Sequence, residues 1–145
     1  MSNKKITVEA TVAAEVNKVW DHWTKPEHIT KWNFADDSWH CPRAENDLRV
    51  GGKYSARMEA KDGSFGFDFE AIYEEVIENK KLVYTMTDGR SATTTFEDRG
   101  GSTDIKIVFD AEDENPIEMQ QSGWQAILDN FKKYTEAEAA KTAAG

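Results

Sequence analysis

The apolar residues near the end of the sequence repeat at the spacing of an α-helix. From Asn115 to about Glu138 they lie three, four or seven residues apart, so a helix aligns them as one stripe: Ile117, Trp124, Ile127, Leu128, Phe131 and Tyr134. Asn115, Pro116 and Glu118 are typical of a helix start, because Asn caps free N–H groups, Pro suits the first position and Glu bonds back to the cap. A helix of roughly 20 residues is about 30 Å long, enough to cross a small domain.

Before this helix, apolar and polar residues mostly alternate, which is the period of half-buried β-strands. The alternating runs are Ile6–Val12, Tyr54–Met58, Phe65–Tyr73, Leu82–Met86, Ala92–Phe96 and Thr103–Phe109. Turn signals separate the later runs at Gly51-Gly52, Asp62-Gly63, Asn79-Lys80, Asp88-Gly89 and Gly100-Gly101. Because such short connections join antiparallel neighbours, the stretch from Ser38 to Phe109 predicts about six strands in one sheet. A break in the alternation at Glu74-Glu75 predicts a β-bulge.

Two short helices are predicted between the first strand and the others. Helical spacing of apolar residues predicts one over about Ala14–Trp23, and Thr24-Lys25-Pro26-Glu27 has the pattern of a capping box for a second that ends near Trp32. A loop follows at Asn33–Asp37. The order predicts an α+β domain, in which the long helix is the one element able to cover the sheet. We expect a single domain over residues 1–145, with an Ala-rich tail over 139–145 that frays.

The composition excludes several classes of partner. The 145 residues include 18 basic and 27 acidic side chains, and the net charge of −9 repels nucleic acid and anionic membranes. No apolar run is long enough to span a membrane, and the N-terminal residues lack the apolar run of a signal peptide. Cys41 is the only cysteine, which excludes an internal disulfide and suits a reducing compartment. We expect a soluble cytoplasmic protein with neither nucleic-acid nor membrane partners.

Motifs that carry catalytic chemistry are missing from the sequence. It has no GxSxG, GxxxxGK[ST], HExxH or CxxC motif and no Rossmann glycine run. The adjacent residues His40 and Cys41 would point to opposite faces of a strand, which favours a buried or half-buried lone thiol over a nucleophile. His22 and His28 lack a metal-ligand spacing, and the acidic residues before the long helix lack the pattern of a calcium loop. The sequence therefore predicts no cofactor, metal or catalytic residue.

Several short segments resemble a known family. They are Val19-Trp20, Pro26-Glu27 leading to Lys31-Trp32, Arg49-Val50-Gly51-Gly52-Lys53-Tyr54, Tyr73-Glu74-Glu75-Val76, Leu82-Val83-Tyr84-Thr85, and Gly123-Trp124 with Leu128-Asp129. In order and spacing, from about Ile6 to Tyr134, they resemble the C-terminal-domain family of the 90-kDa heat-shock chaperone ATPase activator (AHSA-type), within the START-like (SRPBCC) superfamily. The eukaryotic co-chaperone also has a separate N-terminal domain that contacts the chaperone, and we expect no counterpart of it here.

The resemblance implies a helix-grip fold, in which a curved antiparallel sheet of about six to seven strands holds a long C-terminal helix. It also implies a cavity between sheet and helix that often takes apolar small molecules. We therefore expect a non-catalytic domain that binds a hydrophobic or aromatic molecule, lipid-like or polyketide-like. Two alternatives stay open. One is a chaperone-associated stress-response regulator that binds protein through an exposed patch such as Trp23–Trp32, and the other is a cyclase- or dehydratase-like enzyme.

The candidate ligand-binding residues are large apolar side chains with a few polar groups among them. Such residues are core by default, and the same types line ligand pockets, so the sequence does not separate the two. Gly123 in the long helix fits either close approach of a strand or space above a cavity. Gln120 either faces water at the open end of the helix or orients a ligand. The residues predicted to bind the ligand are Trp32, Phe34, Trp39, Tyr54, Met58, Phe67, Phe69, Gln120 and Trp124.

Overall fold

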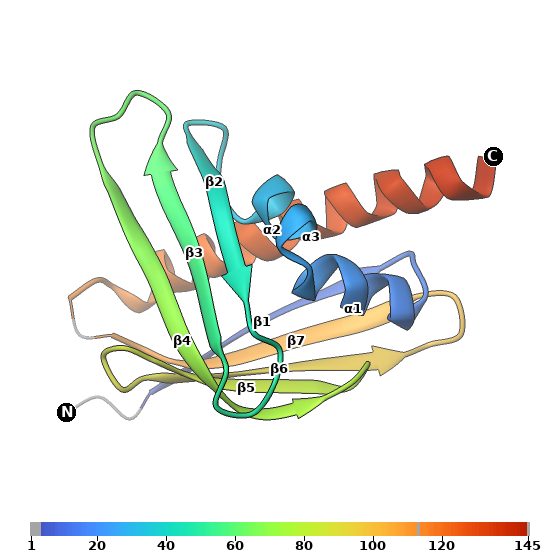
Figure 1. Cartoon of the computed structure of the whole chain (residues 1–145), viewed down its shortest axis with the longest axis horizontal. Coiled ribbons are helices and arrows are strands. Elements are labelled where there is room, and N and C mark those ends of the chain that lie inside the picture. Colours follow the sequence, from blue (N-terminus) through green and yellow to red (C-terminus); the bar gives the residue numbers. More distant parts are fainter. Residues whose placement is uncertain (1–3, 113, 145) are drawn as a thin grey trace.

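A single antiparallel sheet curls around one long helix in the computed structural model, which describes residues 4–112 and 114–144 (Figure 1). The strands follow the order β1-β7-β6-β5-β4-β3-β2 across the sheet. The elements are β1 Lys5–Val12, α1 Val16–Thr24, α2 Pro26–Trp32, β2 Trp39–Asn46, β3 Lys53–Ala60, β4 Gly66–Ile77, β5 Lys81–Met86, β6 Ser91–Asp98, β7 Thr103–Asp110 and α3 Ile117–Ala144. The two short helices carry the chain from β1 at one edge to β2 at the other. This is the α+β order that the sequence pattern predicts and the helix-grip architecture that the family resemblance implies.

The five predicted turns all lie between consecutive strands and have a common backbone feature. Each contains one residue with a positive φ angle: Gly51, Gly63, Asn79, Gly89 and Gly100. Glycine adopts this conformation freely, and Asn79 belongs to the residue types that tolerate it best among the others. The bulge predicted at Glu74-Glu75 is also confirmed, because the register between β4 and β5 shifts between Tyr73 and Glu75. Turn chemistry therefore sets the strand boundaries.

The alternation of apolar and polar residues does not predict strand β2. It contains Pro42, and its register against β3 shifts between His40 and Arg43. Proline has no N–H to donate to a sheet ladder, so it is tolerated on an edge strand or at a bulge. Because β2 has both of these features, the fold accepts a strand whose sequence lacks regular alternation.

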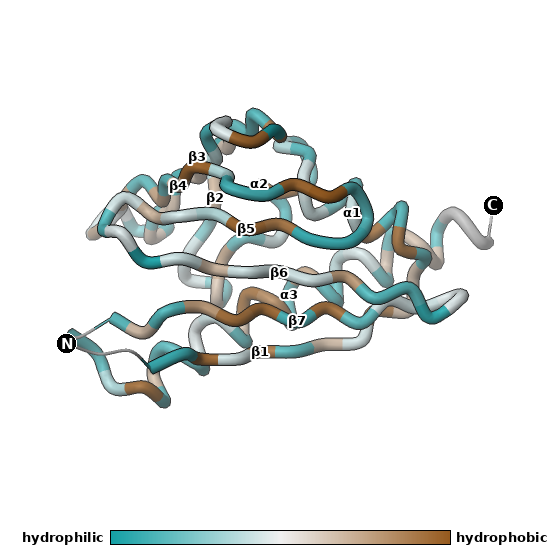
Figure 2. Tube along the Cα trace, turned by 90° about the horizontal axis from the view of Figure 1, so that it is seen from below, coloured by the Kyte–Doolittle hydropathy of each residue, from teal (hydrophilic) through white to brown (hydrophobic). Residues whose placement is uncertain are grey.

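The long helix α3 buries its apolar stripe against the inner face of the sheet. Leu128 and Phe131 are fully buried, and the Trp124 ring stacks on Phe109 of β7 with 3.8 Å between ring centroids. Figure 2 shows β5, β6, β7 and β1 side by side from below, with α3 behind them. The helix continues to Ala144, past Glu138, where the predicted helix ends. Within residues 4–112 and 114–144, no helix combines the length and apolarity needed to cross a membrane.

The capping box predicted for α2 is wrong. Lys25 is the N-cap residue of this helix, and no side chain caps it. Thr24 is buried in the last turn of α1, where its Oγ1 donates to the backbone carbonyl of Trp20 at 2.8 Å. The hydroxyl thus bonds the carbonyl four residues back, a common alternative for Ser and Thr inside helices.

The start of α3 also differs from the prediction, because Gln120 rather than Asn115 organises it. The Gln120 side chain folds back onto the preceding loop, where its Nε2 donates to the Asn115 carbonyl at 2.7 Å. Its Oε1 accepts from the backbone N–H of Glu112 at 2.9 Å, and the Asn115 amide is bonded to the Glu112 carboxylate instead. Gln120 is buried, so it does not face water at the helix end as the first alternative predicts.

The exposed edge of the sheet at β1 is covered by polar side chains of α3. Outward-facing backbone carbonyls of alternate β1 residues each accept one hydrogen bond from the helix. The pairs are Gln121 to Thr7 at 3.2 Å, Gln125 to Glu9 at 3.0 Å and Lys132 to Thr11 at 2.8 Å. These bonds fix the helix along the β1 edge, while its apolar stripe faces the sheet.

Candidate functional site

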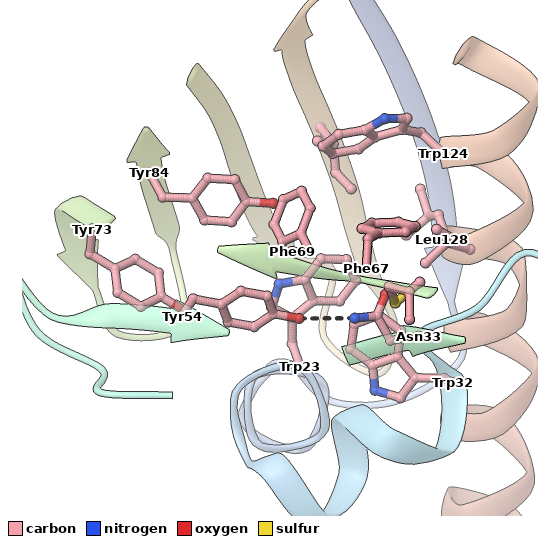
Figure 3. A pocket seen from close by; sticks show the side chains of 13 residues that line it. Trp23, Trp32, Asn33, Tyr54, Phe67, Phe69, Tyr73, Tyr84, Trp124 and Leu128 are labelled. Carbon is pink, nitrogen blue, oxygen red and sulfur yellow. Dashed lines mark hydrogen bonds between the residues drawn. The ribbon is translucent and has the colours of Figure 1, made fainter. Parts of the chain in front are cut away.

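A pocket of about 190 Å³ lies between the inner face of the sheet and α3 (Figure 3). It is surrounded by side chains from the three helices and from strands β3, β4, β5 and β7. Most of these side chains are aromatic or aliphatic. The lining residues are Trp23, Trp32, Asn33, Tyr54, Met58, Phe67, Phe69, Tyr73, Tyr84, Ile107, Trp124, Ile127 and Leu128.

The periodicity of the elements explains why these side chains meet. Tyr54 and Met58 are an even number of residues apart on β3, so they point to the same face of the sheet. Met58 pairs with Phe67 on β4, which extends the apolar surface across both strands. Trp124 and Leu128 are one helical turn apart on α3 and therefore face the sheet together.

The structure brings most of the predicted ligand-binding residues around this one pocket. Trp32, Tyr54, Met58, Phe67, Phe69 and Trp124 all line it. Three others lie outside the lining: Phe34 is in the loop after α2, Trp39 begins β2, and Gln120 bonds the loop before α3. Trp39 lies close by, since its ring centroid is 6.2 Å from that of Phe67. A Cβ on Gly123 would meet nothing within 4 Å, which rules out close approach of a strand as the reason for this glycine.

Sequence reasoning missed seven lining residues: Trp23, Asn33, Tyr73, Tyr84, Ile107, Ile127 and Leu128. Some had a usable signal, because Tyr73 is four residues beyond Phe69 on the same strand and Leu128 is one turn beyond Trp124. Tyr84 had none of this kind. Its place follows from the β4–β5 register, which pairs it with Tyr73 across the bulged strand.

One side of the pocket rests on a cluster of aromatic rings from the three helices. The Trp23 and Trp32 rings stack with 4.8 Å between centroids. Phe131 of α3 meets both rings edge-on, at 4.8 Å from Trp23 and 5.0 Å from Trp32. The Trp32 indole N–H also donates to the His22 carbonyl at 3.0 Å. Because these rings are locked by one another and by this hydrogen bond, this side of the pocket is preformed.

Polar groups in the lining are few, and some of them bond within the protein. Asn33 Nδ2 donates to the Tyr54 hydroxyl at 3.1 Å, the interaction drawn as a dashed line in Figure 3. The Tyr73 hydroxyl donates to Asn46 Oδ1 at 2.8 Å. Burial raises the pKa of Tyr54, Tyr73 and Tyr84 above the ordinary value of tyrosine, so all three phenols stay protonated near neutral pH. The lining includes neither acidic nor basic side chains.

Cys41 and the pair His22 and His28 are reactive side chains that lie outside the pocket lining. Burial raises the pKa of the Cys41 thiol to about 11, which makes it a poor nucleophile and agrees with the buried thiol that the sequence favours. His22 and His28 lie together where α1 and α2 meet α3, with 4.2 Å between ring centroids. Among the residues that the structure describes, no cluster of His, Cys, Asp and Glu could hold a metal ion.

The fold and the pocket together define a helix-grip domain of the START-like (SRPBCC) class. The family model described as "Activator of Hsp90 ATPase homolog 1-like protein" matches residues 13–136, and the chain belongs to this family. The family predicted from the short sequence motifs is thereby confirmed.

Solved structures of relatives agree with this assignment. The chain is similar to an AHSA1-like protein from Aeromonas hydrophila, with 42% identity over 94% of each chain and a TM-score of 0.88. It is also similar to Chr148 from Cytophaga hutchinsonii, with 50% identity over 94% of each chain and a TM-score of 0.79. Protein CV1439 from Chromobacterium violaceum shares the fold, with 24% identity, 92% of this chain and 98% of that one covered, and a TM-score of 0.82. No curated protein matches the chain.

Proposed function

We propose that the protein is a non-catalytic binding protein that holds a small apolar or aromatic molecule in the pocket between the sheet and α3. The observation that carries the proposal is the pocket itself, which is roofed by the Trp124 side of the helix and lined by aromatic residues from several elements. Ligand pockets are typically concave, mainly apolar and supplied with a few fixed polar groups. This pocket has all three properties.

The pocket volume limits the size of the ligand. An engineered apolar cavity of about 150 Å³ in another protein binds benzene, and the pocket here is somewhat larger at about 190 Å³. Sites for drug-sized ligands span about 300–1,000 Å³. A compact molecule of one or two rings therefore fits better than a long acyl chain.

The polar groups of the lining favour binding over catalysis. General acid–base catalysis needs a group whose pKa lies near the working pH. The titratable lining groups are tyrosines whose pKa values are raised by burial, and the lining has no carboxylate, imidazole or amine. A cyclase- or dehydratase-like activity would have to draw its acid or base from outside the pocket lining.

The family name gives one reason to consider chaperone binding as a second function, since it describes an activator of Hsp90 ATPase. The segment suggested for such contact, Trp23–Trp32, does not suit it. Trp32 is buried, and Trp23 packs against Phe131, so both indoles belong to the interior. Small-molecule binding therefore has the stronger structural support.

Substitution Trp124→Ala tests the proposal, because this indole contributes a large apolar surface to the pocket while being only half-buried. Naphthalene, followed by NMR chemical-shift changes of backbone amides, is a suitable probe of two-ring size. We expect the substitution to weaken naphthalene binding at least tenfold, equivalent to about 1.4 kcal/mol, and to leave the protein folded.

The matched control is Trp20→Phe, which changes a buried indole that packs on Phe96 at 5.5 Å and lies outside the lining. We expect it to lower the melting temperature and to keep the wild-type affinity. Unchanged affinity in folded Trp124→Ala protein would refute the placement of the ligand, and failure of the wild type to bind naphthalene or any other apolar probe of this size would refute the function. Native mass spectrometry of freshly purified protein would reveal a ligand carried from the cell as a mass lost on denaturation.

A further inference from the structure

The hydroxyl group of Tyr84 differs from those of its two neighbours in the pocket. Tyr54, Tyr73 and Tyr84 form one cluster, with the Tyr84 ring 6.0 Å from Tyr54 and 6.1 Å from Tyr73. The Tyr54 hydroxyl accepts a hydrogen bond from Asn33, and the Tyr73 hydroxyl donates one to Asn46. The Tyr84 hydroxyl has no hydrogen-bond partner among the residues that the structure describes.

This hydroxyl faces space that a ligand can reach. In the described part of the chain, every fully enclosed side-chain nitrogen or oxygen has a hydrogen-bond partner. The unpaired Tyr84 oxygen is therefore not sealed in the core, and its ring lines the pocket beside Phe69, 5.9 Å away between centroids. In Figure 3 the Tyr84 side chain extends from β5 toward Phe69 with its oxygen leading.

Several donors in the lining have no acceptor within the described part of the protein. They are the Tyr84 O–H, the Trp23 indole N–H and the Tyr54 O–H, whose oxygen only accepts from Asn33, whereas the Trp32 N–H is already bonded to a backbone carbonyl. The lining has no charged side chain to balance an ionic ligand. Burying an unpaired charge in such surroundings is strongly unfavourable, so the pocket favours an uncharged ligand that brings its own acceptor.

We propose that Tyr84 is the polar anchor of the site and donates its O–H to an acceptor atom of an uncharged aromatic ligand, such as a carbonyl oxygen, an ether oxygen or a ring nitrogen. This inference rests on the proposed binding function and adds the ligand's chemical class to it. A plain hydrocarbon would displace water from the hydroxyl without replacing its hydrogen bond. A ligand with a suitably placed acceptor restores that bond and binds more tightly.

The test compares naphthalene with quinoline and isoquinoline, which have the same two-ring shape but carry one acceptor nitrogen. Affinities are measured by NMR titration at mildly alkaline pH, where both heterocycles are uncharged. The wild type is expected to bind the better heterocycle roughly three- to tenfold more tightly than naphthalene, the range expected for one neutral hydrogen bond. 2-Naphthoate, which is anionic, is expected to bind more weakly than either neutral class of probe.

The variant Tyr84→Phe removes the hydroxyl and keeps the ring. It is expected to abolish the preference for the heterocycle while naphthalene affinity stays within about twofold of the wild type. Tyr73→Phe is the matched control, because this tyrosine also lines the pocket but its hydroxyl is already engaged with Asn46. We expect Tyr73→Phe to keep the heterocycle preference.

The possible outcomes test the role of Tyr84 separately from the proposed binding function. If none of the probes binds the wild type, both the proposed function and the anchor role of Tyr84 are refuted. If naphthalene binds and the heterocycles show no advantage, the inference is wrong and the binding function stands. The same holds if the preference survives in Tyr84→Phe or if 2-naphthoate binds most tightly. The comparison of probes on the wild type can still refute the inference if a variant folds poorly.

Discussion

A buried histidine at the junction of the helices is expected to make the stability of the domain depend on pH. His22 is only 5% exposed, and its Nδ1 lies 3.1 Å from Thr135 Oγ1 on α3. Its pKa is lowered from 6.5 to about 4, chiefly by burial and to a smaller extent by the neighbouring His28 and Lys18. Two carboxylates also face it, Asp21 on α1 and Glu138 on α3, and they act in the opposite direction.

The sign of the effect follows from which state binds the proton first. The unfolded chain protonates His22 at its ordinary pKa of 6.5, whereas the folded protein does so only near pH 4. Between these values the unfolded state binds more protons, so the free energy of unfolding falls as the pH falls. The contribution is fully present above about pH 6.5 and, by the linkage relation, about 2.5 kcal/mol of it is lost at about pH 4.5.

Urea denaturation at about pH 7 and about pH 4.5 measures this loss. Carboxylates also titrate in this range, so the informative quantity is the difference between the wild type and His22→Gln. We expect the variant to lose about 2–3 kcal/mol less than the wild type over the interval. His40→Gln is the control, because His40 is half-exposed near Glu59 at the surface, where ion pairs contribute little. Equal losses in the wild type and His22→Gln would refute the reasoning.

Two further predictions concern stability. Gly123→Ala should raise the free energy of unfolding by ~1 kcal/mol, because alanine favours helix and the new methyl group meets nothing within 4 Å; a lower urea midpoint would contradict this. Thr103→Val should cost about 1–3 kcal/mol, because the buried Thr103 Oγ1 donates to the Ala14 carbonyl at 2.9 Å and that acceptor loses its partner. The control Thr95→Val breaks an exposed bond of 3.4 Å to Lys106 and should change stability by under about 0.5 kcal/mol, and equal costs for both would refute the argument.

The alternating pattern predicts the strands well wherever one face is buried and the other is exposed. Strand β7 is the clearest case, since Ile105, Ile107 and Phe109 are buried and the residues between them are less so. The pattern fails at β2, where an edge position tolerates Pro42 and a bulge. Local periodicity therefore predicts strands whose alternate side chains face the core. It misses the edge strand β2, which is held in place by its pairing with β3 and not by a regular apolar pattern.

The pocket was predictable only in part because its lining depends on register between elements. Met58 and Phe67 are directly paired across β3 and β4, and both could be named from the strand pattern. Tyr84 lies on β5, whose register against β4 depends on the bulge near Tyr73. The sequence predicts where this bulge lies, but it does not predict that Tyr84 pairs with Tyr73. Gln120 shows the opposite error, because its position on the apolar stripe suggested the pocket while the loop before α3 engages it.

The polar contacts between α3 and β1 bear on how the molecule behaves at high concentration. A free sheet edge is a template on which another chain can add a strand, which is a common start of aggregation. At β1 the outward carbonyls of Thr7, Glu9 and Thr11 are already engaged by α3, and at the other edge β2 presents Pro42 and a bulge. Both edges of the sheet therefore carry features that oppose strand addition, and at the β1 edge this protection is supplied by the same helix that covers the inner face.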